Sequence, residues 1–109
     1  MTADDLTAVR TLFAGHSDMR ELPLNARRAA VMLKLELTPI AGAVSALLLR
    51  DAAECGSHGL IVYDPELSPA QQRADIALAV AEYIAGTCGY DWPEDAPQLA
   101  ALFGVTCDR

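Results

Sequence analysis

The side chains able to do chemistry are few and scattered along the chain. Cys55 and His58 stand three positions apart in a polar stretch, a spacing at which two side chains can bind one metal ion. Cys88 is followed by the carboxylates of Asp91 and Glu94. The sequence shows no second matched pair of ligands, and Cys88 as a nucleophile needs a base such as His58 to be brought to it by the fold. A hydrolase with a metal or thiol site is therefore one hypothesis.

The segment 68–86, SPAQQRADIALAVAEYIAG, has the strongest helix pattern of the chain. Ser68 suits the N-cap with Gln71 completing a capping box, Pro69 suits the first helical position, and Gly86 suits the C-terminal cap. Apolar residues recur one turn apart and form a stripe that we expect to pack on a sheet: Ile76, Ala77, Val80, Tyr83 and Ile84.

A second stripe of this helix consists of Asp75, Leu78, Ala79 and Glu82, which we call the 75/78/79/82 face. Positions 78, 79 and 82 have the spacing at which an H-E-x-x-H motif presents two zinc-binding histidines and a general base. Zinc needs both imidazoles, and the glutamate between them activates the bound water. Leucine and alanine can do neither, and Glu82 alone offers too few ligands. We therefore expect no zinc chemistry, no resident metal and no cofactor on this face.

The residues around this face resemble the ImmA/IrrE family of regulatory metallopeptidases. Residues 59–86, GLIVYDPELSPAQQRADIALAVAEYIAG, contain a strand pattern, a short polar turn and a capped helix, with Arg73 near the helix start as in the family. The family's helix has the form I/L-A-H-E-L-G-H-x-L. In this sequence Leu78, Ala79 and Glu82 replace its histidine, glutamate and second histidine.

The resemblance implies a zincin-like scaffold without the peptidase activity. It is specific over residues 59–86 and coarse over 25–58, where a helix, a strand and a hairpin are expected in the family's order. The family takes a further acidic ligand from a following helix, for which Glu94 and Asp95 are the nearest candidates. Family members commonly act beside helix-turn-helix repressors in phages and mobile elements. The resemblance thus implies a non-catalytic, regulatory protein whose 75/78/79/82 face binds a protein partner, such as a repressor.

Composition narrows the class of protein. The chain has 109 residues, which predicts one domain over 1–109, and 52 % hydrophobic with 21 % charged residues is typical of a globular protein. A net charge of −7 argues against direct binding of nucleic acid and is compatible with a basic protein partner. The three cysteines form no CxxC pair and no signal peptide is visible, so we expect a cytoplasmic protein with free thiols. No apolar run approaches the about 18 residues of a membrane span.

The remaining elements follow from local patterns. Helices are expected at 2–14 and 26–33 and after a cap at Asp95, and strands at 35–40 and 59–64. Pro39 lacks a backbone N–H and marks its strand as an edge strand. Residues 43–50 suit either a helix or a buried strand. The predicted class is α+β, with a small antiparallel sheet between Leu35 and Asp64 packed against the helix at 68–86.

Two alternatives compete with the binding hypothesis. The alanine-rich helix at 68–86 is equally compatible with ordinary core packing, in which case the 75/78/79/82 face is buried instead of opening on a cleft. The apolar run 41–49, AGAVSALLL, becomes a self-association surface if the fold leaves it uncovered, which would make the protein a structural homodimer.

Overall fold

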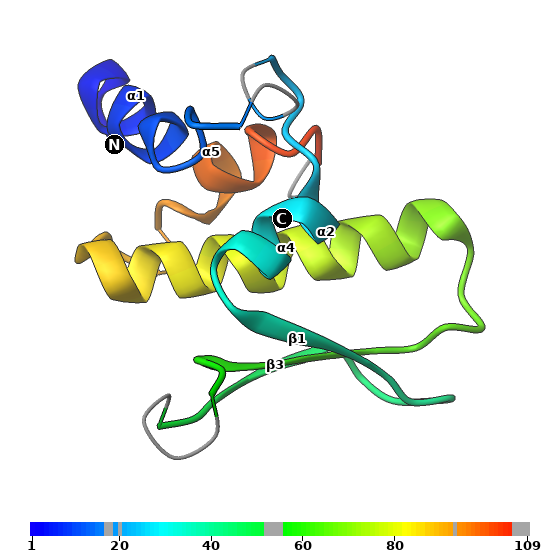
Figure 1. The fold of residues 1–109 in the computed structure, drawn as a ribbon. Coiled ribbons are helices and arrows are strands. Elements are labelled where there is room, and N and C mark those ends of the chain that lie inside the picture. Colours follow the sequence, from blue (N-terminus) through cyan, green and yellow to red (C-terminus); the bar gives the residue numbers. More distant parts are fainter. Residues whose placement is uncertain (17–18, 20, 52–55, 93, 106–109) are drawn as a thin grey trace.

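In the computed structural model, helices lie on one side of a three-stranded sheet, and none of the described helices covers its other side (Figure 1). The structure describes residues 1–16, 19, 21–51, 56–92 and 94–105. The elements in chain order are α1 (Ala3–Thr11), α2 (Ala26–Met32), β1 (Leu35–Pro39), β2 (Ala46–Leu49), β3 (Gly59–Tyr63), α4 (Pro69–Cys88) and α5 (Ala96–Ala101). The predicted α+β class is confirmed.

The sheet is mixed, because the order of the strands in space differs from their order along the chain. β3 lies in the centre, with β1 and β2 as the two edges. β2 pairs with β3 in antiparallel fashion, so the stretch 43–50 contributes a strand and not a helix. β1 pairs with β3 in parallel fashion. The prediction of an antiparallel sheet between Leu35 and Asp64 therefore holds for β2–β3 and is wrong for β1–β3.

The strand in the central position, β3, is the most buried of the three. Ile61 is fully buried, and Val62 and Tyr63 are at most 9 % exposed. β1 and β2 run in opposite directions with a space between them, and β3 fills that space, so it must be parallel to one neighbour and antiparallel to the other. A Cβ atom on Gly59 would lie 2.6 Å from the carbonyl oxygen of Leu48, which explains why a glycine stands at this point of the β2–β3 contact.

The start of α4 follows the local pattern, and its end does not. The Ser68 hydroxyl accepts a hydrogen bond from the Gln71 backbone N–H at 3.2 Å, as predicted. The Gln71 side chain instead donates to Asp75 at 2.9 Å. The helix continues through Gly86 and ends at Gly89, whose φ of 78° is left-handed. The predicted cap at Gly86 is wrong because a terminating glycine needs this left-handed conformation, which Gly89 adopts.

The core extends from the contact of α4 with the sheet and α2 to the buried residues of the α1 and α5 regions, such as Phe13 and Phe103. Ile76, Ala77, Val80 and Ile84 are buried as predicted, and Tyr83 is half-buried. α2 and α4 pack against each other, and small side chains let helices approach closely. The buried alanines of these two helices are Ala26, Ala29, Ala30, Ala77, Ala79, Ala81 and Ala85. In the part of the chain that the structure describes, no helix is both long and apolar enough to cross a membrane.

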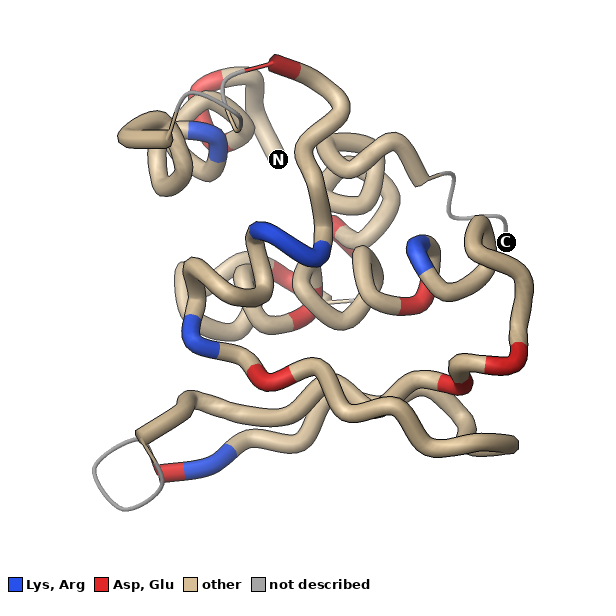
Figure 2. The backbone as a smooth tube through the Cα atoms, turned by 45° about the vertical axis from the view of Figure 1, so that its right-hand side comes forward, with Lys and Arg blue, Asp and Glu red and all other residues tan. Residues whose placement is uncertain are grey.

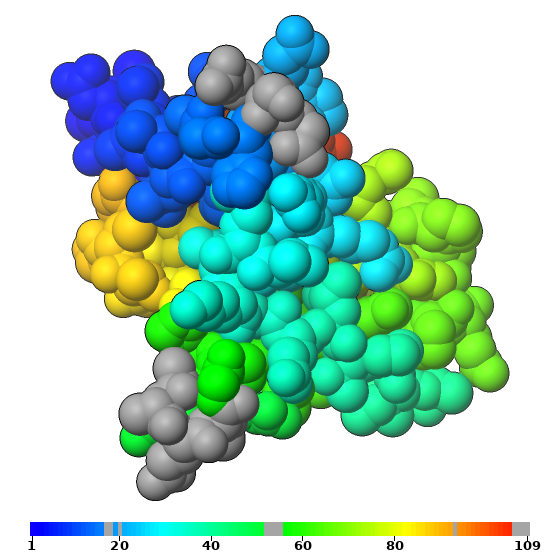
Figure 3. Space-filling model, in the orientation of Figure 1, coloured from blue at the N-terminus to red at the C-terminus, as the bar shows by residue number. Residues whose placement is uncertain are grey.

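The N-terminal segment joins the far end of the chain. Thr2 and Asp5 form the reciprocal hydrogen bonds of a capping box at the start of α1. The amino group of Met1 lies 3.2 Å from the Asp95 carboxylate. Asp95 also accepts a hydrogen bond from the Asp91 backbone and makes no side-chain cap for α5, contrary to the predicted role. The N-terminal segment thereby lies next to the region where α4 ends (Figure 3).

Candidate functional site

The four residues of the 75/78/79/82 face lie together and line one small hollow. Its volume is about 80 Å³, and its opposite wall comes from β2 and from Trp92. Ala79 is 6 % exposed, Asp75 and Leu78 are half-buried, and Glu82 is exposed. The face therefore neither opens on a deep cleft nor disappears into the core. A hollow of this size holds a few water molecules, at about 30 Å³ each.

The chemistry of the hollow is limited by its side chains. Leu78 and Ala79 carry no metal ligand and no group that accepts a proton. The Asp75 carboxylate is held by the Gln71 amide. The remaining lining residues are Ser45, Ala46, Leu47, Glu82 and Trp92. Two carboxylates without an imidazole, a thiolate or a cation beside them do not make the tetrahedral site of a zinc hydrolase.

A larger groove begins where the hollow ends. Its volume is about 430 Å³, and it shares Leu47, Glu82 and Trp92 with the hollow. It runs between the later turns of α4 and the β2 edge of the sheet. The residues that line only the groove are Leu49, Tyr83, Gly86, Thr87 and Tyr90. Glu82 therefore stands at the junction of two connected depressions.

The wall of the groove is aromatic. Trp92 is 37 % exposed and Tyr90 is half-buried, so both rings contribute surface to the groove, and Tyr90 also packs against the core. Burial raises the pKa of the Tyr90 phenol, and the carboxylates of Asp5 and Asp95 act in the same direction. The Tyr90 hydroxyl consequently stays protonated well into the alkaline range and can donate a hydrogen bond.

The floor of the groove is formed by β2, whose outer edge is not paired with another strand of the described chain. The Arg50 backbone N–H donates to His58 of the neighbouring loop at 3.0 Å, so residue 50 points its backbone groups toward the β3 side. Because these directions alternate along a strand, Leu47 and Leu49 point their N–H and C=O groups outward. No strand of the described chain pairs with this side of β2. Leu49 is 71 % exposed and Leu48 is 51 % exposed.

The residues of the alternative metal or thiol site lie in different surroundings. Cys55 lies outside the described residues. Cys88 is an exposed free thiol in the last turn of α4. The His58 ring packs near Tyr83, with ring centroids 6.4 Å apart. Among the described residues, Cys88 and His58 are not observed to pair as nucleophile and base.

The acidic candidates after α4 are engaged in local structure. The Asp95 carboxylate is bound by the Met1 amino group and by the Asp91 backbone N–H. Glu94 is exposed. Within the described ranges, no three His, Cys, Asp or Glu side chains gather where they could hold one metal ion.

Sequence reasoning identified the 75/78/79/82 face and missed the larger groove. Tyr83 was assigned to the buried stripe, and Leu47 and Leu49 to the apolar run, so none of them was grouped with Glu82. The available signal was the helical spacing of Glu82, Tyr83 and Gly86, in which the glycine leaves room beside two larger side chains. No family model, no curated protein and no solved structure matches the chain.

Proposed function

We propose that this protein binds a partner protein without catalysing a reaction, by accepting an extended segment of the partner along β2. The observation that carries the proposal is the open apolar edge of the sheet beside a groove that joins the 75/78/79/82 face. Sheet edges of this kind bind peptides by strand addition, in which main-chain hydrogen bonds supply affinity and alternate side chains supply specificity.

The geometry of the β2 edge determines which side chains of such a segment the protein would contact. The outward backbone groups of Leu47 and Leu49 would pair with the added strand. Every second side chain of that strand would then project into the groove, because side chains alternate across a sheet. Apolar side chains there would contact Leu47, Tyr83 and Trp92.

The charge of the site indicates a basic segment. Glu82 lines both depressions and is exposed, Asp75 lines the hollow, and neither depression is lined by Lys, Arg or His. The chain as a whole has a net charge of −7. Complementary charge speeds association and selects among partners more than it adds affinity. A Lys or Arg opposite Glu82 is therefore the specificity element that we infer.

The resemblance to ImmA/IrrE peptidases supports the choice of a protein partner. On this proposal the chain has kept a peptidase-like scaffold, lost its zinc ligands at positions 78, 79 and 82, and acts as a regulator in the cytoplasm. A helix-turn-helix repressor is the partner that the family relation implies. The proposal is compatible with the order of β3, the turn after it and the capped α4. We propose no direct contact with nucleic acid or membrane.

A display library of extended peptides tests the proposal. We expect the peptides enriched on the wild-type protein to alternate apolar residues and to carry a Lys or Arg. The variant Glu82→Lys should weaken these peptides by about tenfold, because it turns an attractive charge into a repulsive one. Glu66→Lys is the matched control, since it makes the same charge change at an exposed turn outside both depressions.

The outcome is decisive in either direction. Failure to enrich any peptide, or equal binding to the Glu82→Lys and wild-type proteins, would contradict the proposed site. Equal weakening by Glu66→Lys would mean that the peptides respond only to overall charge. Circular dichroism of both variants checks that the fold is kept.

A homodimer is the second candidate, and the exposure of the run 41–49 favours it. Val44 is 87 % exposed, and Leu48 and Leu49 follow on the same edge. Antiparallel pairing of β2 with β2 of a second copy would give a symmetric interface. Each copy has a net charge of −7, so charge repulsion opposes self-association. The same charge would attract a basic partner. Sedimentation that shows only monomer at high protein concentration would remove this candidate.

A further inference from the structure

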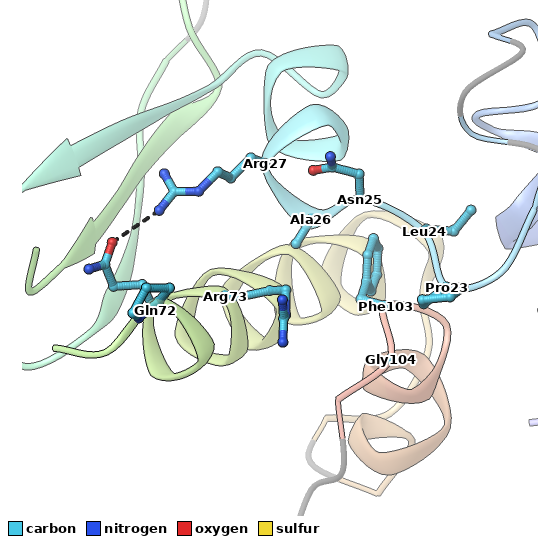
Figure 4. Close-up of a pocket in the computed structure, with 10 residues that line it drawn as sticks. Pro23, Leu24, Asn25, Ala26, Arg27, Gln72, Arg73, Phe103 and Gly104 are labelled. Carbon is cyan, nitrogen blue, oxygen red and sulfur yellow. Dashed lines mark hydrogen bonds between the residues drawn. The ribbon is translucent and has the colours of Figure 1, made fainter.

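A second, larger pocket lies away from the β2 groove, where the starts of α2 and α4 meet the turn after α5 (Figure 4). Its volume is about 620 Å³, and it shares no lining residue with the groove or the hollow. Arg27 of α2 and Arg73 of α4 both line it, together with the polar side chains of Asn25 and Gln72. None of its lining residues is acidic.

The pocket is lined by positive charges, although the chain as a whole is negatively charged. The sequence has 15 acidic and 8 basic residues, yet two guanidinium groups and no carboxylate line this pocket. Apart from Arg28, which follows Arg27, the other Lys and Arg positions that the structure describes are spread along the backbone (Figure 2). The pocket therefore suits a small anion, whereas a long polyanion needs many phosphate contacts along a basic surface.

One of the two arginines is held in place by its neighbours. Arg27 donates from Nη2 to the Gln72 side-chain oxygen at 3.1 Å, and its guanidinium lies 5.2 Å from the centre of the Tyr63 ring. Gln72 is itself fixed, because its amide donates to the carbonyl oxygens of Pro65 and Leu67 at 2.9 and 2.8 Å. A guanidinium has several N–H donors, so Arg27 retains donors for a ligand after binding Gln72.

The second arginine adds a donor that can move. Arg73 is exposed and forms no hydrogen bond or ion pair with the described residues. It follows Gln72 directly on α4 and lies between Gln72 and Phe103 in the view of Figure 4. Pro23 and Pro69 line the pocket with exposed apolar rings, whereas Phe103 and Leu24, which also line it, are only 2 % and 3 % exposed. The pocket thus combines an ordered cation, an adjustable cation and an apolar wall.

We propose that this pocket binds a small organic anion. A carboxylate or phosphate group of the ligand accepts hydrogen bonds from Arg27 and Arg73, and an apolar or aromatic body lies along the exposed rings of Pro23 and Pro69. Arginine suits this role because its planar fork of donors matches the oxygens of both anions.

Titration of the full chain with three probes tests the proposal. Benzoate and phenyl phosphate each join an anion to an aromatic ring, and inorganic phosphate lacks the ring. We expect saturable shifts of the amide resonances around the pocket, with at least one aromatic probe binding more tightly than inorganic phosphate. The tighter of the two aromatic probes identifies the anion as a carboxylate or a phosphate.

Three variants connect the binding to the arginines. Arg73→Gln and Arg27→Gln should each raise the Kd of the tighter probe by about tenfold, because each removes a charge-assisted hydrogen bond. Lys34→Gln removes the same charge from an exposed side chain outside the pocket and should leave the Kd within about twofold. Arg73 is exposed, so Arg73→Gln should keep the fold even if Arg27→Gln does not.

The proposal is overturned if none of the probes saturates. It is also overturned if Arg73→Gln leaves the Kd unchanged, or if Lys34→Gln raises it as much as the pocket variants do. Glu82→Lys should have no effect on these titrations, since Glu82 lines only the groove and the hollow. Failure of this proposal is therefore separate from failure of strand addition at β2.

Discussion

At the β1 edge of the sheet, the backbone groups that point outward belong to Leu35, Leu37 and Pro39. The carbonyl oxygen of Lys34 and the N–H of Ile40 bond to the β3 side, at 2.8 and 2.9 Å, which sets this alternation. Pro39 has no N–H to offer at the open side. α2 packs against β1, and Leu35 is only 3 % exposed.

At the β2 edge, α4 contacts the strand, but no residue of the strand is buried. Leu47 and Leu49 point their backbone groups outward, and the strand Ala46–Leu49 contains neither a proline nor a charged residue. Leu49 is 71 % exposed. Folded proteins commonly protect edge strands with prolines, charges or covering elements. The contrast indicates that β1 is closed to further pairing, and it is the reason that we place the partner at β2.

The largest expected difference between the two edges is in stability. Leu35→Ala should lower the free energy of unfolding by about 2–4 kcal/mol, because it opens a cavity under α2. Leu49→Ala should change it by less than about 0.5 kcal/mol, since most of that side chain is already in water. Urea unfolding of the two variants measures the difference. Similar losses would mean that β2 is covered in solution.

A second test concerns how closely β2 and β3 approach. Gly59→Ala should destabilise the protein by about 1–3 kcal/mol, because the new methyl group would meet the Leu48 carbonyl oxygen. Amide hydrogen exchange should show loss of protection mainly in β2 and less in β1. Gly15→Ala is a suitable control, since a Cβ atom there meets nothing within 4 Å. Equal protection of β2 in the variant and the wild type would contradict the close contact.

A third test gives β2 the proline that β1 has. Leu49→Pro removes an outward N–H and leaves the bonds to β3 in place, so it should cost less than about 1 kcal/mol of stability. It should weaken peptides selected on the wild-type protein by about tenfold, because a main-chain hydrogen bond to the added strand is lost. Peptide affinity is the measurement, and Leu49→Ala separates the loss of the side chain from the loss of the N–H. Full affinity in Leu49→Pro would exclude strand addition at this edge.

The smallest expected effect concerns Tyr90, in the groove wall beside β2. Because burial raises its pKa, the folded state holds the phenolic proton more tightly than the unfolded state does. The resulting stabilisation is complete below the unfolded-state pKa and is lost as the pH rises through the folded-state pKa. Tyrosinate absorbance should therefore contain a late phase that Tyr90→Phe removes. A wild-type titration without a late phase would place Tyr90 in open solvent.

Local patterns predicted much of the scaffold. The Ser68 hydroxyl caps α4, and the apolar segment Gly59–Tyr63 forms a buried strand, because capping and strand propensity depend on nearby residues. The 75/78/79/82 face was also predicted as a unit, since helical spacing alone brings its members together. The end of α4 was not predicted, because Gly86 and Gly89 are equally suitable by residue type and only the conformation distinguishes them.

The arrangement of the strands and the larger groove could not be obtained in this way. The parallel β1–β3 pair follows from β3 entering between two strands that precede it, a choice made by long-range packing. Trp92 and Tyr90 belong to the groove only because the loop after α4 folds back beside β2. Neither the strand pairing nor the position of this loop can be recognised from the spacing of residues that are close in sequence.

The sequence by itself determined the chemical types at each position. Leu78 and Ala79 cannot bind zinc in any fold, and Pro39 cannot donate a hydrogen bond at any edge. The tertiary structure decided which edge is open, which side chains surround Glu82, and that Arg27 and Arg73 line the same pocket. The physical reason is that residue type and local propensity act over one or two turns of chain, whereas edges and pockets arise from contacts between segments that are distant in sequence.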